Sequence, residues 1–193
     1  MTPASTSKLS LATTLESDDG AIALLDFNRE VIAQATSLLD LFDSHHAAAF
    51  AGPVGAHLRH IIEHYDALLS PAIAGFVDYD ARVRDRELER STNLARRRLH
   101  AVSQRLVANN GLLKSPLRVR GQGGLAGDFN FTIASTFGRE LVFVASHALH
   151  HYALMRPYCQ TAGILLSEDF GKAPSTVAYE RATSASTKIS ITP

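Results

Sequence analysis

The chain has 193 residues, 46% of them hydrophobic, and its 19 Lys and Arg balance 19 Asp and Glu, so the formal net charge is zero. This length fits one domain with a substantial core, and a neutral chain lacks the overall positive charge that attracts nucleic acids or anionic lipids. We therefore expect neither a nucleic-acid partner nor a membrane partner.

Cysteine content and hydropathy indicate the compartment. The single cysteine, Cys159, cannot form an internal disulfide. Residues 1–18 lack the basic-then-apolar order of a secretory signal, and no apolar run approaches the roughly 20 residues that a membrane-spanning helix needs. The sequence therefore predicts a soluble, cytoplasmic protein.

Amphipathic patterns predict two helices in the first part of the chain. Residues 1–18 are rich in Ser and Thr, and we expect them to form a flexible arm. A capping sequence, DDG, then opens an apolar stripe of helical period from Ala21 to about Asp43. Pro53 is tolerated at a helix start, and a second amphipathic pattern runs from Val54 to about Ala74.

Two more helical patterns follow, with a change of periodicity between them. The third helix is predicted from about Arg82 to Asn109. The segments PLRVR and FNFTIA flank a glycine-rich stretch and are typical of a short β-hairpin. The fourth helix is predicted from about Thr136 to Ala162, with Gly163 as its terminator.

These elements together predict an all-α fold. We expect an antiparallel four-helix bundle over residues 19–170, with the small β-hairpin between its third and fourth helices. Residues 171–193 have no sustained period and are interrupted by proline, so we expect an extended C-terminal tail.

Six of the nine histidines lie in two short, otherwise apolar stretches, HLRHIIEH and HALHH. They are His57, His60, His64, His147, His150 and His151. Because a helix turns by about 100° per residue, all of them except His150 fall on the apolar sides of the second and fourth predicted helices. A buried imidazole needs partners for its nitrogens, so several at one place indicate a shared ligand.

The spacing of His147 and His151 is typical of a metal site, although ordinary histidines also show it. Residues four apart lie about 6 Å apart along one helical face, where both imidazoles can bind one transition metal. A third histidine would complete a site for Zn, Fe, Co or Ni that leaves a position open for water or substrate. Helical phase leaves His57, His60 and His64 as candidates for this ligand.

Other polar residues have two interpretations each. Glu140 lies two turns before His147, so it is a candidate catalytic base or ligand-orienting group, while the helix dipole alone also favours glutamate there. Three arginines can bind an anionic substrate or form a solvated, salt-bridged face. They are Arg59, Arg82 and Arg84. Cys159 lies about 80° around the helix from His151, so we expect an inert thiol.

The histidine motifs resemble those of the DinB-like superfamily. The resemblance covers roughly residues 20–165 and is carried by HLRHIIEHYDALL and SHALHHYALM, while DYDARVRD and FGKAPST are similar to an uncharacterised branch. It implies a four-helix bundle with a three-histidine metal site whose ligands are His60, His147 and His151. His57 and His64 are then alternates or supporting partners.

Members of this superfamily also imply a chemistry. They include thiol transferases that use bacillithiol or mycothiol, a maleylpyruvate isomerase, and a domain of an enzyme that joins a thiol to a histidine betaine. In these relatives a metal lowers the pKa of a small thiol or of water. We therefore expect a mononuclear divalent-metal protein, with Zn, Ni or Fe, that acts as a thiol transferase or hydrolase on a small molecule, and a homodimer is compatible with this fold.

Two other functions stay open at this point. One is a non-enzymatic bundle in which a metal, or hydrogen bonds among the histidines, stabilises the fold. The other is a hemerythrin-like di-iron protein, which needs bridging carboxylates at spacings that this sequence lacks.

Overall fold

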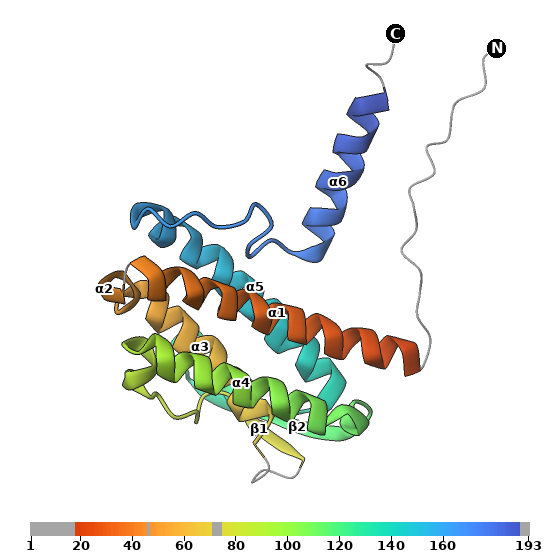
Figure 1. The fold of residues 1–193 in the computed structure, drawn as a ribbon. Helices are drawn as coiled ribbons and strands as arrows, with labels where there is room; N and C mark the ends of the chain where they lie inside the picture. The colour runs from red at the N-terminus through yellow and green to blue at the C-terminus, as the bar shows by residue number, and fades with distance from the viewer. Residues whose placement is uncertain (1–17, 46, 71–74, 190–193) are drawn as a thin grey trace, which may run out of the picture.

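The computed structural model describes residues 18–45, 47–70 and 75–189, which are mostly helical with a small three-stranded sheet (Figure 1). In chain order the elements are α1 (Asp18–His45), α2 (Ala47–Phe50), α3 (Pro53–Leu68), β1 (Phe76–Asp78), the 3-10 helix η1 (Arg86–Glu89), α4 (Thr92–Ala108), the 3-10 helix η2 (Asn110–Leu112), β2 (Pro116–Gly123), β3 (Phe129–Thr136), α5 (Phe137–Thr161) and α6 (Pro174–Ile189). The predicted arm lies outside the described residues, except for Asp18.

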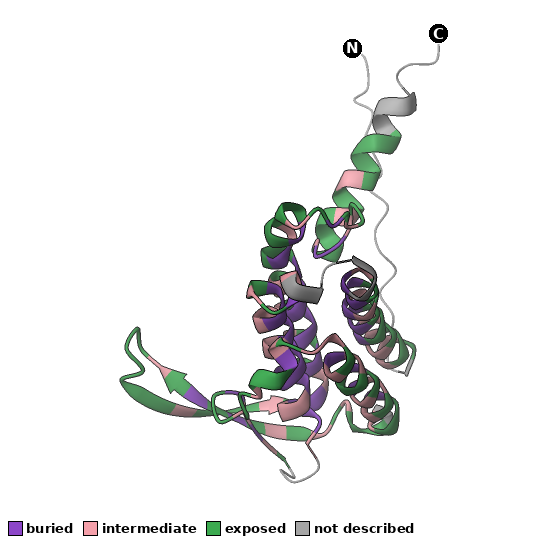
Figure 2. Ribbon diagram, turned by 60° about the vertical axis from the view of Figure 1, so that its left-hand side comes forward, coloured by how far each residue is buried: buried purple, intermediate pink, exposed green. Residues whose placement is uncertain are grey.

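Four helices, α1, α3, α4 and α5, pack around one apolar core. Both α1 and α3 contact α4 and α5. The buried faces of these helices turn toward one another (Figure 2). Among the largest fully buried side chains are Tyr65, Tyr152, Phe42 and Phe50. In the part of the chain that the structure describes, no helix is both long and apolar enough to cross a bilayer.

Local signals explain where the helices begin. Pro53 occupies the first turn of α3, where its missing N–H costs nothing. The side chain of Thr136 caps α5 by accepting from the N–H of Arg139. α5 ends next to Gly163, which adopts a positive φ of 73°. These limits agree with the predicted starts of the second and fourth helices and with the predicted end of the fourth.

The third predicted helix begins ten residues later than expected, at Thr92 instead of Arg82. Two side chains end the preceding irregular segment: Asp85 caps η1 and Ser91 caps α4 through the N–H of Leu94. Before them, the carboxylate of Asp78 accepts the N–H groups of Asp80 and Ala81. These local bonds compete with α-helix formation, so the arginine-rich pattern becomes α-helical only after Ser91.

The predicted hairpin is present. β2 and β3 pair antiparallel from Pro116↔Thr136 to Gly123↔Phe129. β1 adds a third strand, parallel to β2, that the sequence pattern did not reveal because it has only three residues. The far end of the hairpin extends away from the helices (Figure 2).

The C-terminal segment differs from the extended tail expected over residues 171–193. Pro174–Ile189 form α6, which projects from the rest of the molecule (Figure 1). Two ion pairs join the middle of α6 to the segment before it: Lys172 Nζ lies 2.5 Å from Glu180 Oε2, and Arg181 Nη2 lies 2.9 Å from Asp169 Oδ2. Ion pairs at a surface contribute little to stability, so they orient α6 more than they stabilise it.

Residues 164–171 fold back over α5. Arg156 Nη2 donates to three carbonyl oxygens, of Ser167, Glu168 and Phe170. The ring of Phe170 stacks on Tyr152, with centroids 5.2 Å apart. The next residue, Gly171, has a φ of 71° and lies so close to the α5 backbone that a Cβ would sit 2.5 Å from the nitrogen of Ala153. Glycine is therefore required where this segment crosses α5.

Candidate metal centre

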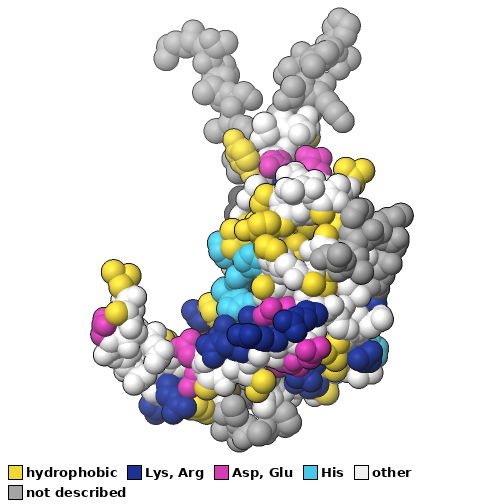
Figure 3. Space-filling model, turned by 90° about the vertical axis from the view of Figure 1, so that its left-hand side faces the viewer, with side chains coloured by type: hydrophobic (Ala, Val, Ile, Leu, Met, Phe, Trp, Pro, Cys, Tyr) yellow, Lys and Arg dark blue, Asp and Glu magenta, His cyan; other side chains and the backbone are white. Residues whose placement is uncertain are grey.

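Packing of α3 against α5 brings together five histidines, which we call the histidine cluster. Its members are His57, His60, His64, His147 and His151. The ring of His60 lies centrally, with its centroid 4.2 Å from that of His64, 5.0 Å from His147 and 4.5 Å from His151. Histidine side chains gather on one face of the molecule, between apolar surface and a band of Lys and Arg (Figure 3).

Three members of the cluster have the spacing of metal ligands. One nitrogen from each of His60, His64 and His147 lies within 4.8 Å of the other two. The Nε2 atoms of His60 and His147 are 2.9 Å apart. Ligand nitrogens at about 2.05 Å in a tetrahedral zinc site are about 3.3 Å apart. Shifts of a few tenths of an ångström would therefore suffice to admit an ion between these two rings.

The ring of His64 is held in one orientation. Its Nδ1 lies 2.7 Å from the carbonyl oxygen of His60. Because a carbonyl oxygen only accepts hydrogen bonds, Nδ1 carries the proton and Nε2 keeps its lone pair. The ring also stacks on Tyr79 at 5.4 Å. A backbone acceptor on the non-ligating nitrogen is the usual support of a metal-binding histidine.

His151 lies beside this group and pairs with His57. The two Nδ1 atoms are 2.8 Å apart, so one ring donates to the other. The centroid of His151 is 4.6 Å from that of His147. Of the predicted ligands, His60 and His147 thus belong to the group with metal-ligand spacing, while His64 takes the third place. His151 as a ligand stays a prediction.

A pattern in the sequence also indicates His64 as a possible ligand. The stretch HIIEH places His60 and His64 four residues apart, the same spacing as His147 and His151. Helical phase places both on one face, and only the resemblance to the DinB-like superfamily selects His60. The packing of α3 on α5 decides which histidines approach His147. The periodicity of a single helix does not reveal how that helix packs against another.

Burial keeps the histidine cluster uncharged at neutral pH. The pKa is lowered to about 2 for His60, about 4 for His64 and about 3 for His151, with desolvation as the largest cause. The positive charges that neighbouring imidazoles would carry contribute to these lowered values. The pKa values of His57 and His147 are lowered as well. Neutral imidazole is the form that binds metals.

Arg82 contacts the cluster from the irregular segment before η1. Its Nη2 donates to Nδ1 of His60 at 3.0 Å, and its Nη1 donates to the carbonyl oxygen of Tyr79 at 2.8 Å. Its Nε makes no hydrogen bond to any described residue, and Glu63 Oε2 is 3.5 Å away. Arg82 therefore joins the histidines to a buried carboxylate.

That carboxylate, Glu63, lies in a network of charges. Glu63 is 4% exposed and accepts from Arg59 Nη1 and from the N–H of Asp85, each at 2.7 Å. Burial raises the pKa of Glu63, which these donors oppose. Arg59 also bonds Glu89 at 2.6 Å. The arginines Arg59 and Arg82 thus take part in ion pairs, as one of their two interpretations predicted, while Arg84 is exposed.

Glu140, the predicted catalytic residue, is buried behind the cluster. Its carboxylate accepts from Tyr79 Oη at 2.8 Å, Ser135 Oγ at 2.6 Å and Arg139 Nη1 at 2.9 Å. The tyrosine ring in turn stacks on His64. In this arrangement Glu140 positions Tyr79, and a role as general base stays a prediction.

Three other candidate residues, His150, His100 and Cys159, lie apart from the centre of the histidine cluster. His150 is exposed on α5, and His100 is exposed on α4, where it contacts Gln104. Cys159 is fully buried, and burial raises the pKa of its thiol to about 11. A thiol with so high a pKa carries little thiolate at neutral pH, in keeping with the expectation that it is inert.

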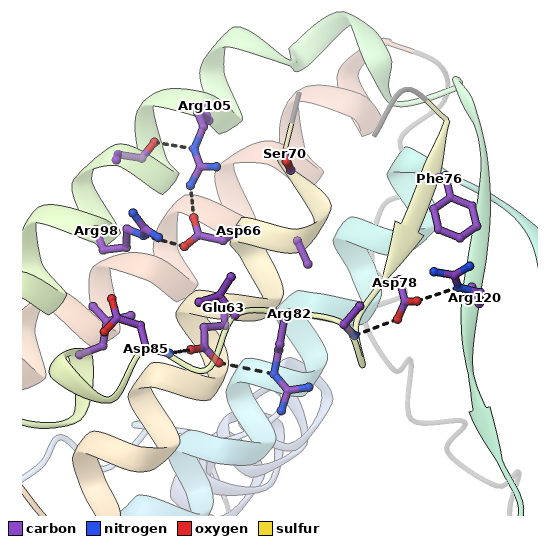
Figure 4. A pocket seen from close by; sticks show the side chains of 15 residues that line it. Glu63, Asp66, Ser70, Phe76, Asp78, Arg82, Asp85, Arg98, Arg105 and Arg120 are labelled. Atoms are coloured by element: carbon purple, nitrogen blue, oxygen red, sulfur yellow. Dashed lines mark hydrogen bonds and ion pairs between the residues drawn. The ribbon is translucent and has the colours of Figure 1, made fainter. Parts of the chain in front are cut away.

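A cavity of about 490 Å³ adjoins the cluster through Arg82 and Glu63 (Figure 4). Its lining comes from α3, α4, β1, β2 and the segment before η1. The lining includes four arginines, Arg82, Arg98, Arg105 and Arg120. Asp66 pairs with both Arg98 and Arg105, and Asp78 pairs with Arg120 at 2.7 Å. Arg82 is thus shared between the cavity and the histidines.

Comparisons with known proteins give one partial match. The chain is 30% identical over 111 residues to FK506-binding protein 5 of Rhizopus delemar. The match covers 57% of this chain and 29% of that protein, so this chain spans well under half of the curated relative. No family model matches the sequence. No solved structure matches it either.

Proposed function

We propose that this chain is a mononuclear divalent-metal protein with a DinB-like, antiparallel four-helix bundle fold. One observation carries the proposal: single nitrogens of His60, His64 and His147 lie within 4.8 Å of one another at the contact of α3 and α5. Facing helices are where bundles build metal sites. The resemblance of the histidine motifs to that superfamily supports the same assignment.

The donor set fits a borderline transition metal. Three neutral imidazoles suit Zn, Ni or Fe, and low pKa values of His60 and His64 keep protons from competing with the ion. The bond from His64 to the His60 carbonyl leaves a lone pair ready for coordination. His60 and His147 would supply the other two donors, with His151 as the alternative.

Three protein ligands support a reaction rather than a structural role, because a coordination position stays open. A metal bound there would lower the pKa of a thiol or of water and so supply a nucleophile at neutral pH. The chain itself would orient the ligands through Tyr79 and Phe143, whose rings stack on His64 and His147. The proposed activity is thiol transfer, or hydrolysis, on a small molecule.

A non-enzymatic bundle is the second candidate, and a specific observation favours it. The histidines already pair across the helices, His60 with His147 at 2.9 Å and His57 with His151 at 2.8 Å. These bonds satisfy buried nitrogens without any ion. In this case the cluster, loaded or not, would only stabilise the contact of α3 with α5.

A di-iron centre receives less support. In the described ranges, the group with metal-ligand spacing consists of histidines alone. Glu63 and Glu140 are each held by arginine and by other donors. A bridging role for either would break those bonds.

Elemental analysis of the purified chain tests the proposal. We expect about one divalent ion per chain after loading with Zn²⁺ and gel filtration, and loss of that ion in His60→Ala and His147→Ala. His100→Ala is the matched control, because His100 is exposed on α4, and it should retain the ion. A loaded wild-type chain without stoichiometric metal would overturn the assignment, and two ions per chain would favour a dinuclear centre.

Turnover separates the two candidates. A metal-loaded chain that transfers a small thiol or hydrolyses a substrate, and loses this activity in His147→Ala, is an enzyme. A chain whose metal raises the midpoint of thermal unfolding without turnover is the structural alternative.

A further inference from the structure

Arg82 takes part in two sites, the histidine cluster and the adjoining cavity. We propose that Arg82 binds the carboxylate or other oxyanion of a small molecule in this cavity, and that this binding releases His60 to coordinate the metal. The inference rests on the proposed metal centre and names the class of its ligand. If so, binding of the anion raises the affinity for the metal, and binding of the metal raises the affinity for the anion.

The first argument is the hydrogen bonding of His60. A neutral imidazole has one N–H and one lone pair. Arg82 Nη2 can only donate a hydrogen bond, so Nδ1 of His60, which it contacts, must be the nitrogen with the lone pair. The proton is then on Nε2, the atom 2.9 Å from His147 Nε2. A protonated Nε2 donates a hydrogen bond and cannot bind a metal, so His60 becomes a ligand through Nε2 only when Arg82 leaves Nδ1.

The second argument is the charge of Arg82. Each of the other arginines that line the cavity pairs with an aspartate, either Asp66 or Asp78. Arg82 donates its hydrogen bonds to two uncharged groups, an imidazole and a carbonyl, and its ion pair with Glu63 is 3.5 Å long with no hydrogen bond at Nε. Glu63, the nearest carboxylate, already accepts two shorter bonds from Arg59 and Asp85. Arg82 is therefore the lining guanidinium whose charge is least compensated.

The third argument is the space around this side chain. Arg82 is 13% exposed and lies in a segment without helix or strand, so its side chain can turn without breaking regular structure. The cavity beside it holds about 490 Å³ (Figure 4). This volume accommodates a small organic acid or a molecule with a phosphate-like group. A guanidinium can form two parallel hydrogen bonds with a carboxylate or a phosphate-like group. The imidazole and the carbonyl that Arg82 now contacts each accept only one hydrogen bond from it.

The metal-free chain tests the first half of the proposal. The measurement is ¹⁵N NMR of His60 during titration with sodium acetate and, separately, sodium sulfate, at constant ionic strength adjusted with NaCl. The expected result is a saturable change at Nδ1 of His60 in the wild type. Tighter binding of acetate would indicate that the natural ligand carries a carboxylate, and tighter binding of sulfate would indicate a tetrahedral oxyanion. An unchanged Nδ1 resonance with both anions overturns the proposal without reference to any metal.

Metal affinity tests the second half. Co²⁺ binding is measured by competition with a chromophoric chelator, with and without the stronger anion. Releasing one hydrogen bond should tighten Co²⁺ binding by about three- to tenfold in the wild type. Arg82→Met should bind Co²⁺ more tightly from the start and should not respond to the anion.

Arg98→Met is the matched control, since Arg98 lines the same cavity and bonds Asp66, away from the histidines. It should keep the response of the wild type. Equal anion responses in the wild type and in a folded Arg82→Met chain would overturn the proposal. If Arg82→Met does not fold, the wild-type titrations still decide.

The two hypotheses fail in different ways. Absence of Co²⁺ binding in every variant, with the NMR response intact, removes the metal centre and leaves Arg82 as an anion site. Tight Co²⁺ binding that ignores both anions, with no NMR response, keeps the metal centre and removes the inference.

Discussion

His64 donates its Nδ1–H to the carbonyl oxygen of His60, one turn earlier on α3, at 2.7 Å. Because the acceptor is a backbone carbonyl, the bond orients the ring of His64 before any ion is present. A preset ligand loses less side-chain freedom on binding than a mobile one. The carbonyl also fixes the tautomer of His64 with a lone pair on Nε2, whereas either ring can donate in the bond between His57 and His151, so His64 is favoured over His151 as a ligand.

Separate substitutions of the two candidates for the third ligand give different results. We expect His64→Ala to weaken Zn²⁺ binding by at least about tenfold, because a supported ligand is lost. His151→Ala should have a smaller effect, limited to packing and to the bond with His57. The measurement is chelator competition on both variants. A larger loss in His151→Ala would restore the set His60, His147 and His151 that the resemblance to the DinB-like superfamily implies.

The metal-free chain should lose stability as the pH falls. The pKa values of His60, His64 and His151 are about 2, 4 and 3, below the value of 6.5 for an exposed histidine. The unfolded chain therefore takes up protons first, so the free energy of unfolding decreases as the pH falls below about 6.5, and these groups add no pH dependence well above it.

Urea denaturation between pH 8 and pH 4.5 checks this expectation. Carboxylates also contribute to acid sensitivity, so the comparison is with His60→Gln and His64→Gln, which should flatten the profile between pH 6.5 and 5. His100→Gln should leave it unchanged. Identical profiles in all four chains would contradict the lowered pKa values.

Glu140→Gln separates a positioning role from a catalytic one. The carboxylate accepts from Tyr79, Ser135 and Arg139, and an amide replaces one of its two acceptor oxygens with a donor. The expected loss in the free energy of unfolding is about 1 to 3 kcal/mol. Metal stoichiometry should stay at the wild-type value. Full stability with abolished turnover would instead identify Glu140 as a general base.

Gly171→Ala should destabilise the chain by about 2 to 5 kcal/mol. The residue has a positive φ, and its Cβ would lie 2.5 Å from the backbone nitrogen of Ala153, so conformational strain and overpacking add. Gly163→Ala is the matched control: its φ is 73°, but nothing lies within 4 Å of the added Cβ. The control should cost about 1 kcal/mol. Thermal unfolding of both variants measures the difference, and equal losses would show that segment 164–171 does not pack on α5 as described.

The parts of the fold that sequence predicted well depend on local rules. The starts of α3 and α5 follow from Pro53 and from the cap at Thr136, and the hairpin follows from strand-like segments around glycines. The start of α4 was misplaced because Asp85 and Ser91 end the preceding segment through side-chain caps. The apolar periodicity continues through these residues, so periodicity alone does not mark the start of α4.

Other features depend on contacts between distant residues. β1 has three residues and is a strand because it pairs with β2. α6 is tied to the preceding segment by Lys172 and Arg181, in a stretch whose composition favoured an extended chain. Helical phase found the inward histidines, but the cavity beside Arg82 and the burial of Glu140 behind Tyr79 required the packed structure.

The distance along the chain between the two halves of the histidine cluster has a consequence for synthesis. His60 and His147 are 87 residues apart, and their contact forms only when α5 docks on α3. Chains are made from the N-terminus at about 5 to 20 residues per second. His60 and His64 are therefore synthesised several seconds before residue 147 exists, and during this time their imidazoles have no partners from α5. In the metal centre proposed above, the three ligands come together only after translation has passed this point, so metal uptake by a nascent chain would follow the docking of α5.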